Sequence, residues 1–198
     1  MQVTFFKLAN KQLIVFLIGI CGGILLANLG KSEMLSGSAL LEEDALMQVR
    51  YAVIDSRSLF FCLLRQRLGE AGLLLLLSTT FLGLAAVWFY AFRYGASLGI
   101  LLTLLLTGYG VKGILLLLAG LFPQMLIYVP VWALILALSE RTCRRLYYLN
   151  GNEGLTGLKR MWVHLTAQAG LLLFALAVGC GLEAYVNPYL VKLALKLF

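Results

Sequence analysis

Long apolar stretches separated by short polar segments make up most of this chain. A stretch of about 18 or more apolar residues predicts a transmembrane helix, because about 20 residues rising about 1.5 Å each cross a hydrocarbon core of about 30 Å. The stretches predicted to span a membrane cover 13–29, 71–92, 94–109, 113–138 and 163–186. The pattern therefore predicts an all-α, polytopic integral membrane protein. We expect a compact bundle of about five transmembrane helices in a single membrane domain over 1–198.

The composition agrees with this class of protein. The chain is 62% hydrophobic and 13% charged, whereas soluble domains are typically about 45–50% apolar and about 25% charged. The segments outside the predicted spans are too short for a catalytic domain, and they contain no GxSxG, Walker A or HExxH motif. The four cysteines form no CxxC pair. We therefore expect no enzymatic activity, no cofactor and no metal site.

Positive charge flanks the predicted spans. The net charge of +7 favours anionic lipid over nucleic acid as a partner, because Lys and Arg beside a span bind headgroups and set orientation. The first span follows Lys7 and Lys11 without an Ala-x-Ala site after it, so we interpret it as a retained anchor. The basic segment 139–162 is predicted to be a cytoplasmic loop, on the same side as the N-terminus and Arg93. The segment 30–70 then forms an outer loop, and the C-terminus is also outside.

Part of the outer loop has a helical pattern. In the segment 57–68, Phe60, Leu63 and Leu64 fall on one side and Arg65 on another. The pattern predicts an amphipathic helix that leads into the second span. It suits a helix lying on the membrane surface and a helix packed on the bundle equally well.

Small residues recur at a spacing of four within the first and third predicted spans. Such a spacing lets transmembrane backbones approach closely. Gly19 and Gly23 are in register in the first span, and Gly95 and Gly99 in the third. We expect these residues to pack helices inside one molecule, although the sequence does not predict the oligomeric state.

The fourth span is unusual because it contains two prolines. Proline removes a backbone hydrogen bond and clashes with the preceding turn, so we expect this helix to be kinked or broken at Pro123. Gln124 lies beside it and Pro130 follows seven residues later. One interpretation is a discontinuous helix that lines a transport site. The other, which we favour, is a kink that aids packing, with Gln124 bonded to freed carbonyl groups.

The last span carries an acidic residue near its end. Charged residues within a span are costly and usually mark function. Glu183 precedes Asn187 and Pro188 by about one turn, and Pro188 should stop or bend the helix. We predict that Glu183 ties the helix end to another segment, with Lys112 as a candidate partner. Binding of a partner protein or an ion is the alternative.

Three segments in this order resemble the stage II sporulation protein M family. They are FRYGASLGILL, KGILLLLAGLFPQMLIYVPVWALILALS and GLEAYVNPYLVKL. The matched landmarks are Pro123–Gln124, Pro130 and the run from Glu183 to Pro188. The resemblance covers the chain from about Gly69 onward, and the first 70 residues agree with the family only in layout.

The resemblance implies a function in endospore formation. Family members belong to a complex with stage II sporulation proteins D and P, which degrade peptidoglycan while the mother-cell membrane engulfs the forespore. It implies a non-enzymatic membrane scaffold in the mother-cell membrane, and it supplies no catalytic residues. The alternative is a small permease or transporter subunit that uses the broken fourth helix and Glu183.

Overall fold

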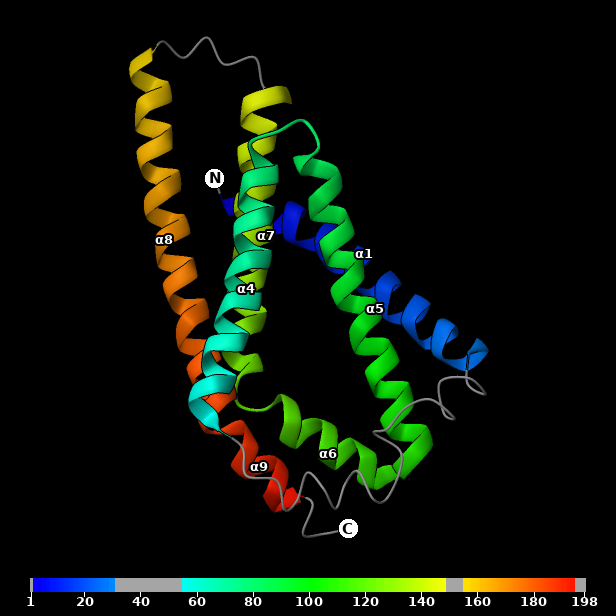
Figure 1. Ribbon diagram of the computed structural model, residues 1–198. Helices are drawn as coiled ribbons and strands as arrows, with labels where there is room; N and C mark the ends of the chain where they lie inside the picture. Colours follow the sequence, from blue (N-terminus) through cyan, green and yellow to red (C-terminus); the bar gives the residue numbers. More distant parts are fainter. Residues whose placement is uncertain (1, 31–54, 149–154, 195–198) are drawn as a thin grey trace.

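The computed structural model describes residues 2–30, 55–148 and 155–194, and this part of the chain is built from helices (Figure 1). The helices are α1 (Gln2–Leu29), α4 (Ser56–Ser78), α5 (Gly83–Tyr109), α6 (Val111–Leu121), α7 (Met125–Cys143), α8 (Leu155–Tyr185) and α9 (Asn187–Ala194). A short π-helix, η2 (Arg144–Tyr148), continues α7. The predicted all-α fold is confirmed.

The long helices α4, α5, α7 and α8 run alternately up and down, and α7 lies among the other three (Figure 1). The helix α1 lies along α5 in the same direction. The short helices α6 and α9 contact each other across the end of the bundle where α5 and α8 end. In Figure 1 the beginning of α1 lies behind α7 in the upper half of the view, and α9 lies at the bottom.

Four segments of the described chain are long and apolar enough to cross a membrane: Lys11–Leu29, Gly83–Tyr109, Met125–Tyr147 and Trp162–Leu193. The helix α4 is not among them, because its first two thirds carry three arginines and Glu70. It nevertheless contacts α5, α7 and α8 along the bundle. The chain is thus a polytopic helical membrane protein with four apolar helices long enough to span. The helix α4 is more polar than these four and packs beside them.

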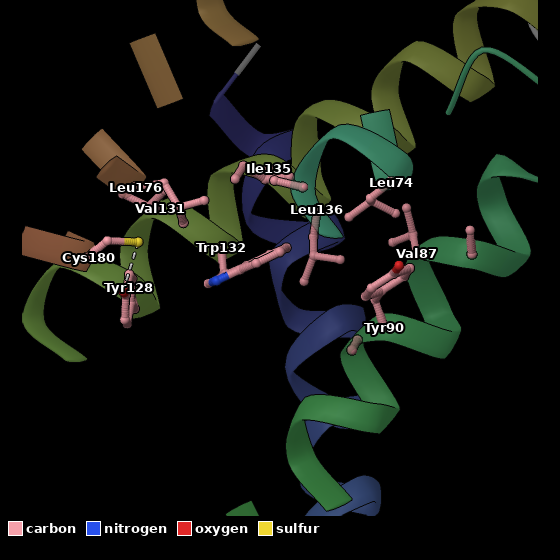
Figure 2. Packing of buried hydrophobic residues seen from close by; sticks show 13 residues of the cluster. Leu74, Val87, Tyr90, Tyr128, Val131, Trp132, Ile135, Leu136, Leu176 and Cys180 are labelled. Carbon is pink, nitrogen blue, oxygen red and sulfur yellow. Dashed lines mark hydrogen bonds between the residues drawn. The ribbon is translucent and has the colours of Figure 1, made fainter. Parts of the chain in front are cut away.

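The core lies where α4, α5, α7 and α8 meet (Figure 2). Leu74 from α4, Val87 from α5, Ile135 from α7 and Leu176 from α8 have no exposed surface. The ring of Trp132 extends toward α5 and lies 4.8 Å from that of Tyr94, measured between centroids. Because lipid supplies no hydrophobic drive for helices to associate, close packing of this kind stabilises the bundle in a bilayer.

The boundary between the second and third spans was predicted at Arg93, and this is wrong. The helix α5 runs without a break through that position, and the chain turns earlier, at residues 79–82. Ser78, Thr79 and Thr80 cause the turn, since each hydroxyl donates to the carbonyl three residues before it, at 2.6–2.7 Å. Gly83 then allows close approach, because a Cβ there would lie 2.8 Å from Ser78 Cα.

This correction moves Arg93 from a loop into a span. Arg93 is the eleventh residue of α5, so it is not the cytoplasmic anchor that the sequence suggested.

Helices extend into both predicted loops. Within the segment 139–162, the chain is helical up to Tyr148, and α8 begins at Leu155. In the outer loop, residues 31–54 lie outside the described residues. The predicted amphipathic helix is confirmed as the start of α4. Phe60, Leu63 and Leu64 pack against the core, so this helix is part of the bundle.

The prediction that small residues pack helices against each other inside one molecule is confirmed for α1 and α5. A Cβ at Gly19 or Gly23 would fall onto the carbonyl oxygen of Phe92 or Ala96 in α5. In return, a Cβ at Gly95 or Gly99 would fall onto a carbonyl oxygen of α1. The two backbones are in direct contact, and any side chain larger than hydrogen would separate them.

The predicted break at Pro123 is confirmed. The helix α6 ends at Leu121 and α7 begins at Met125, with a cis peptide bond between Phe122 and Pro123. At the other end of α6, Gly110 makes the turn from α5 with a φ of 56°, a conformation that glycine adopts without strain. With 11 residues, α6 is too short to span a bilayer.

Candidate functional site

The site that the sequence predicted around Glu183 is formed where α7 and α8 meet. Tyr128 in α7 donates its hydroxyl hydrogen to Glu183 Oε2 at 2.7 Å. The same hydroxyl lies 3.3 Å from the sulfur of Cys180, one turn earlier in α8 (Figure 2). Tyr128 and Cys180 are buried, whereas Glu183 is half-buried. The acid therefore joins two helices through a neutral hydrogen-bond donor.

Two further residues position Tyr128. A Cβ at Gly179 would lie 2.6 Å from Cε1 of the tyrosine, so this glycine makes room for the ring on α8. From α4, the guanidinium carbon of Arg67 lies 5.2 Å from the ring centroid, within the range of a cation–π interaction. Arg67 thereby brings a positive charge toward the part of the bundle that holds Glu183.

Pro123 and Gln124 lie one turn before Tyr128. Gln124 has only 4% of its surface exposed, and its Nε2 donates to the carbonyl oxygen of Gly120 at 2.9 Å. This contact with a carbonyl near the break is the one that the packing interpretation predicted. Gln124 Oε1 is buried and accepts no hydrogen bond. Pro130 is exposed within α7, and the helix continues through it.

Asn187 and Pro188 form the start of α9. The helix α8 ends at Tyr185, and Pro188 occupies the first turn of α9, where its missing N–H needs no partner. Lys112 lies in the first turn of α6, and α6 contacts α9. The predicted pairing of Lys112 with Glu183 stays a prediction, since the hydrogen bond described for Glu183 is the one from Tyr128.

A second polar cluster, which the sequence reasoning missed, links α4 to α5. Arg93 Nη2 lies 2.8 Å from Glu70 Oε1, and the Tyr94 hydroxyl donates to Glu70 Oε2 at 2.7 Å. Glu70 had been placed at the end of a loop and Arg93 at a membrane surface. Residues 23 positions apart are not neighbours on one helix, so the spacing did not predict this pair. Predicting it requires the position of the turn between α4 and α5.

A third cluster fixes α1 to α7. Glu140 is completely buried and accepts hydrogen bonds from Gln12 Nε2 and Arg144 Nε, both at 2.8 Å. Glu140 had been assigned to the loop 139–162. Its spacing of four from Arg144 is the available signal, since such a pair favours a helix.

The three clusters have one chemical property in common. Glu70, Glu140 and Glu183 each accept a hydrogen bond from a residue of another helix. Each carboxylate is thus partly neutralised or hydrogen-bonded, as charge inside a membrane protein requires. The arrangement ties helices together.

Fold and site define an all-α polytopic membrane protein whose acidic residues join its helices. The family model of stage II sporulation protein M matches residues 12–188. The chain therefore belongs to this family, and it is a sporulation-related membrane protein. No curated protein and no solved structure matches the chain.

Proposed function

We propose that this protein is a non-enzymatic membrane scaffold in a peptidoglycan-degrading complex that acts in engulfment. The proposed partners are stage II sporulation proteins D and P, and the proposed location is the mother-cell membrane. Family membership over residues 12–188 supports the sporulation role. The observation that carries the scaffold role is the use of Glu70, Glu140 and Glu183 as ties between helices.

A rigid bundle suits a scaffold, because a partner needs a surface that keeps its shape. The fixed carboxylates and the backbone contact of α1 with α5 both limit relative movement of the helices. Hydrolysis of peptidoglycan would then be the task of the partners.

The second candidate is a small permease or transporter subunit. The break at Pro123, with the buried and unpaired Gln124 Oε1 beside it, is the observation that favours it. Discontinuous helices of this kind form binding sites in transporters. In those proteins, however, the break lies near the middle of the membrane, whereas here it lies at the end of the bundle where α6 and α9 meet.

Two substitutions of Glu183 separate the candidates. Glu183→Gln keeps an oxygen that accepts the Tyr128 hydrogen bond, so a scaffold should support engulfment at the normal level. Glu183→Leu leaves the Tyr128 hydroxyl without this acceptor, at a cost of about 1–3 kcal/mol, and should lower protein abundance. A transporter that uses the charge should fail with Gln although the protein accumulates normally.

The assay scores engulfment with a membrane dye in sporulating cells, with protein abundance and co-purified proteins D and P measured in parallel. Tyr185→Phe is the matched control, because Tyr185 is exposed on the same turn of α8. Loss of engulfment in Glu183→Gln, with the complex intact and abundant, would refute the scaffold.

A further inference from the structure

The outer face of α5 carries a charged side chain within a candidate span. Arg93 lies about 15 Å along the helix from Gly83, at a rise of about 1.5 Å per residue, inside the span Gly83–Tyr109. Its side chain is 46% exposed, whereas that of its partner Glu70 is 16% exposed. Nearly half of an arginine side chain therefore faces the surroundings of the bundle at membrane depth.

Most N–H donors of Arg93 form no hydrogen bond within the described residues. A guanidinium group has five N–H donors, and in this part of the chain Arg93 donates one hydrogen bond, from Nη2 to Glu70. Its guanidinium carbon also lies 5.8 Å from the ring centroids of Tyr90 and Tyr94. The second oxygen of Glu70 is occupied by Tyr94. The remaining donors of Arg93 need an acceptor, because an exposed charge in the hydrocarbon region is costly.

A groove of about 490 Å³ runs along α5 beside this side chain. Arg93 and Phe89 line one part of it, and Leu104 lines it about three turns further along. Between them lie Ala96 and Ser97, whose small side chains leave space for a close approach. Such a shape fits a second helix that lies along α5.

We propose that this groove binds the transmembrane helix of another protein, and that this helix places a carboxylate against Arg93. Charge complementarity selects this occupant. Within the described helices, Glu70, Glu140 and Glu183 already accept hydrogen bonds inside the bundle, which favours a carboxylate of another protein over one from a second copy of this chain. A lipid phosphate belongs at the membrane surface, and Arg93 lies about 15 Å along α5 from its start. The inference names a partner-binding surface for the proposed scaffold. It rests on the scaffold function only because it assumes that the protein has a partner in the membrane.

The test uses the purified full-length protein in phosphatidylcholine vesicles with a synthetic Leu/Ala transmembrane peptide that carries a central Asp. An otherwise identical peptide with a central Leu is the control. Energy transfer between labels on peptide and protein measures association. We expect the Asp peptide to bind at least tenfold more tightly than the Leu peptide, and Arg93→Gln to abolish the difference.

A second variant guards against a general effect of losing the ion pair with Glu70. Ser97→Phe fills the groove from an exposed position and leaves Arg93 in place, so it should also prevent binding of the Asp peptide. Leu171→Phe is the matched control, since Leu171 is 70% exposed on α8 and away from the groove. It should bind the peptide normally.

Three results would overturn the inference. The first is equal binding of both peptides, or binding that Arg93→Gln leaves unchanged. The second is association of two copies of the protein that Ser97→Phe prevents. The third is displacement of the Asp peptide when phosphatidylglycerol replaces phosphatidylcholine, which would assign the groove to anionic lipid. The assay contains no hydrolase, so each of these results leaves the co-purification test of the scaffold function unaffected.

Discussion

The contact of α1 with α5 predicts opposite outcomes for two adjacent glycines. Gly23 faces α5, and a Cβ there would fall onto the carbonyl oxygen of Ala96. At Gly22 the nearest neighbour of an added Cβ is a side-chain atom, Cζ of Phe92, at 3.5 Å. We expect Gly23→Ala to destabilise the protein and Gly22→Ala to leave it unchanged or slightly more stable.

The magnitude follows from the geometry. A Cβ contact under 3.0 Å is one that proteins essentially never show, so Gly23→Ala must move two backbones apart. Overpacking of this kind typically costs about 1–3 kcal/mol. Replacing a helical glycine by alanine favours the helix by up to about 1 kcal/mol. This gain applies equally at both positions, so the variants should differ in unfolding free energy by about 1–3 kcal/mol.

The measurement is an unfolding titration in mixed detergent micelles with increasing SDS. Tryptophan fluorescence reports the transition, because Trp132 lies in the core. Gly99→Ala gives an independent check from the other helix, since its Cβ would fall onto the carbonyl oxygen of Ile20. If Gly23→Ala and Gly22→Ala unfolded at the same SDS fraction, the direct backbone contact between α1 and α5 would be incorrect.

The other interhelical ties give two further predictions. Arg144→Ala should destabilise the protein by about 3–5 kcal/mol, because it leaves the buried Glu140 without its cation. The double variant Arg144→Ala with Glu140→Gln should recover part of this loss in the same SDS titration. If it recovered none, the unpaired charge of Glu140 would not be the cause of the loss. Gly179→Ala should move the ring of Tyr128 and lower the free energy of unfolding by about 1–3 kcal/mol. Gly181→Ala should leave it unchanged, because an added Cβ at Gly181 would meet open space. Equal stability of these two variants would contradict the packing of Tyr128 on α8.

The sequence alone determined the class of this protein. Apolar stretches long enough to cross a bilayer follow from composition and order along the chain, and no tertiary contact is needed to recognise them. The break at Pro123 was also determined locally, since proline disrupts a helix whatever packs against it. The close contact at Gly19, Gly23, Gly95 and Gly99 followed from spacing, because residues four apart lie on one face.

The tertiary structure decided where the helices begin and end and which polar residues meet. The hydroxyl groups of residues 78–80 turn the chain before Arg93 is reached, and hydropathy does not register such bonds because Ser and Thr are only weakly polar. That turn carries Glu70 to Arg93, and the fold carries Glu140 to Gln12, 128 residues away. A charged residue near an apolar stretch has the same sequence signature at a membrane surface and inside a bundle. Only the position of a partner on another helix distinguishes the two, since a charge is stable within the membrane when its partner is in contact.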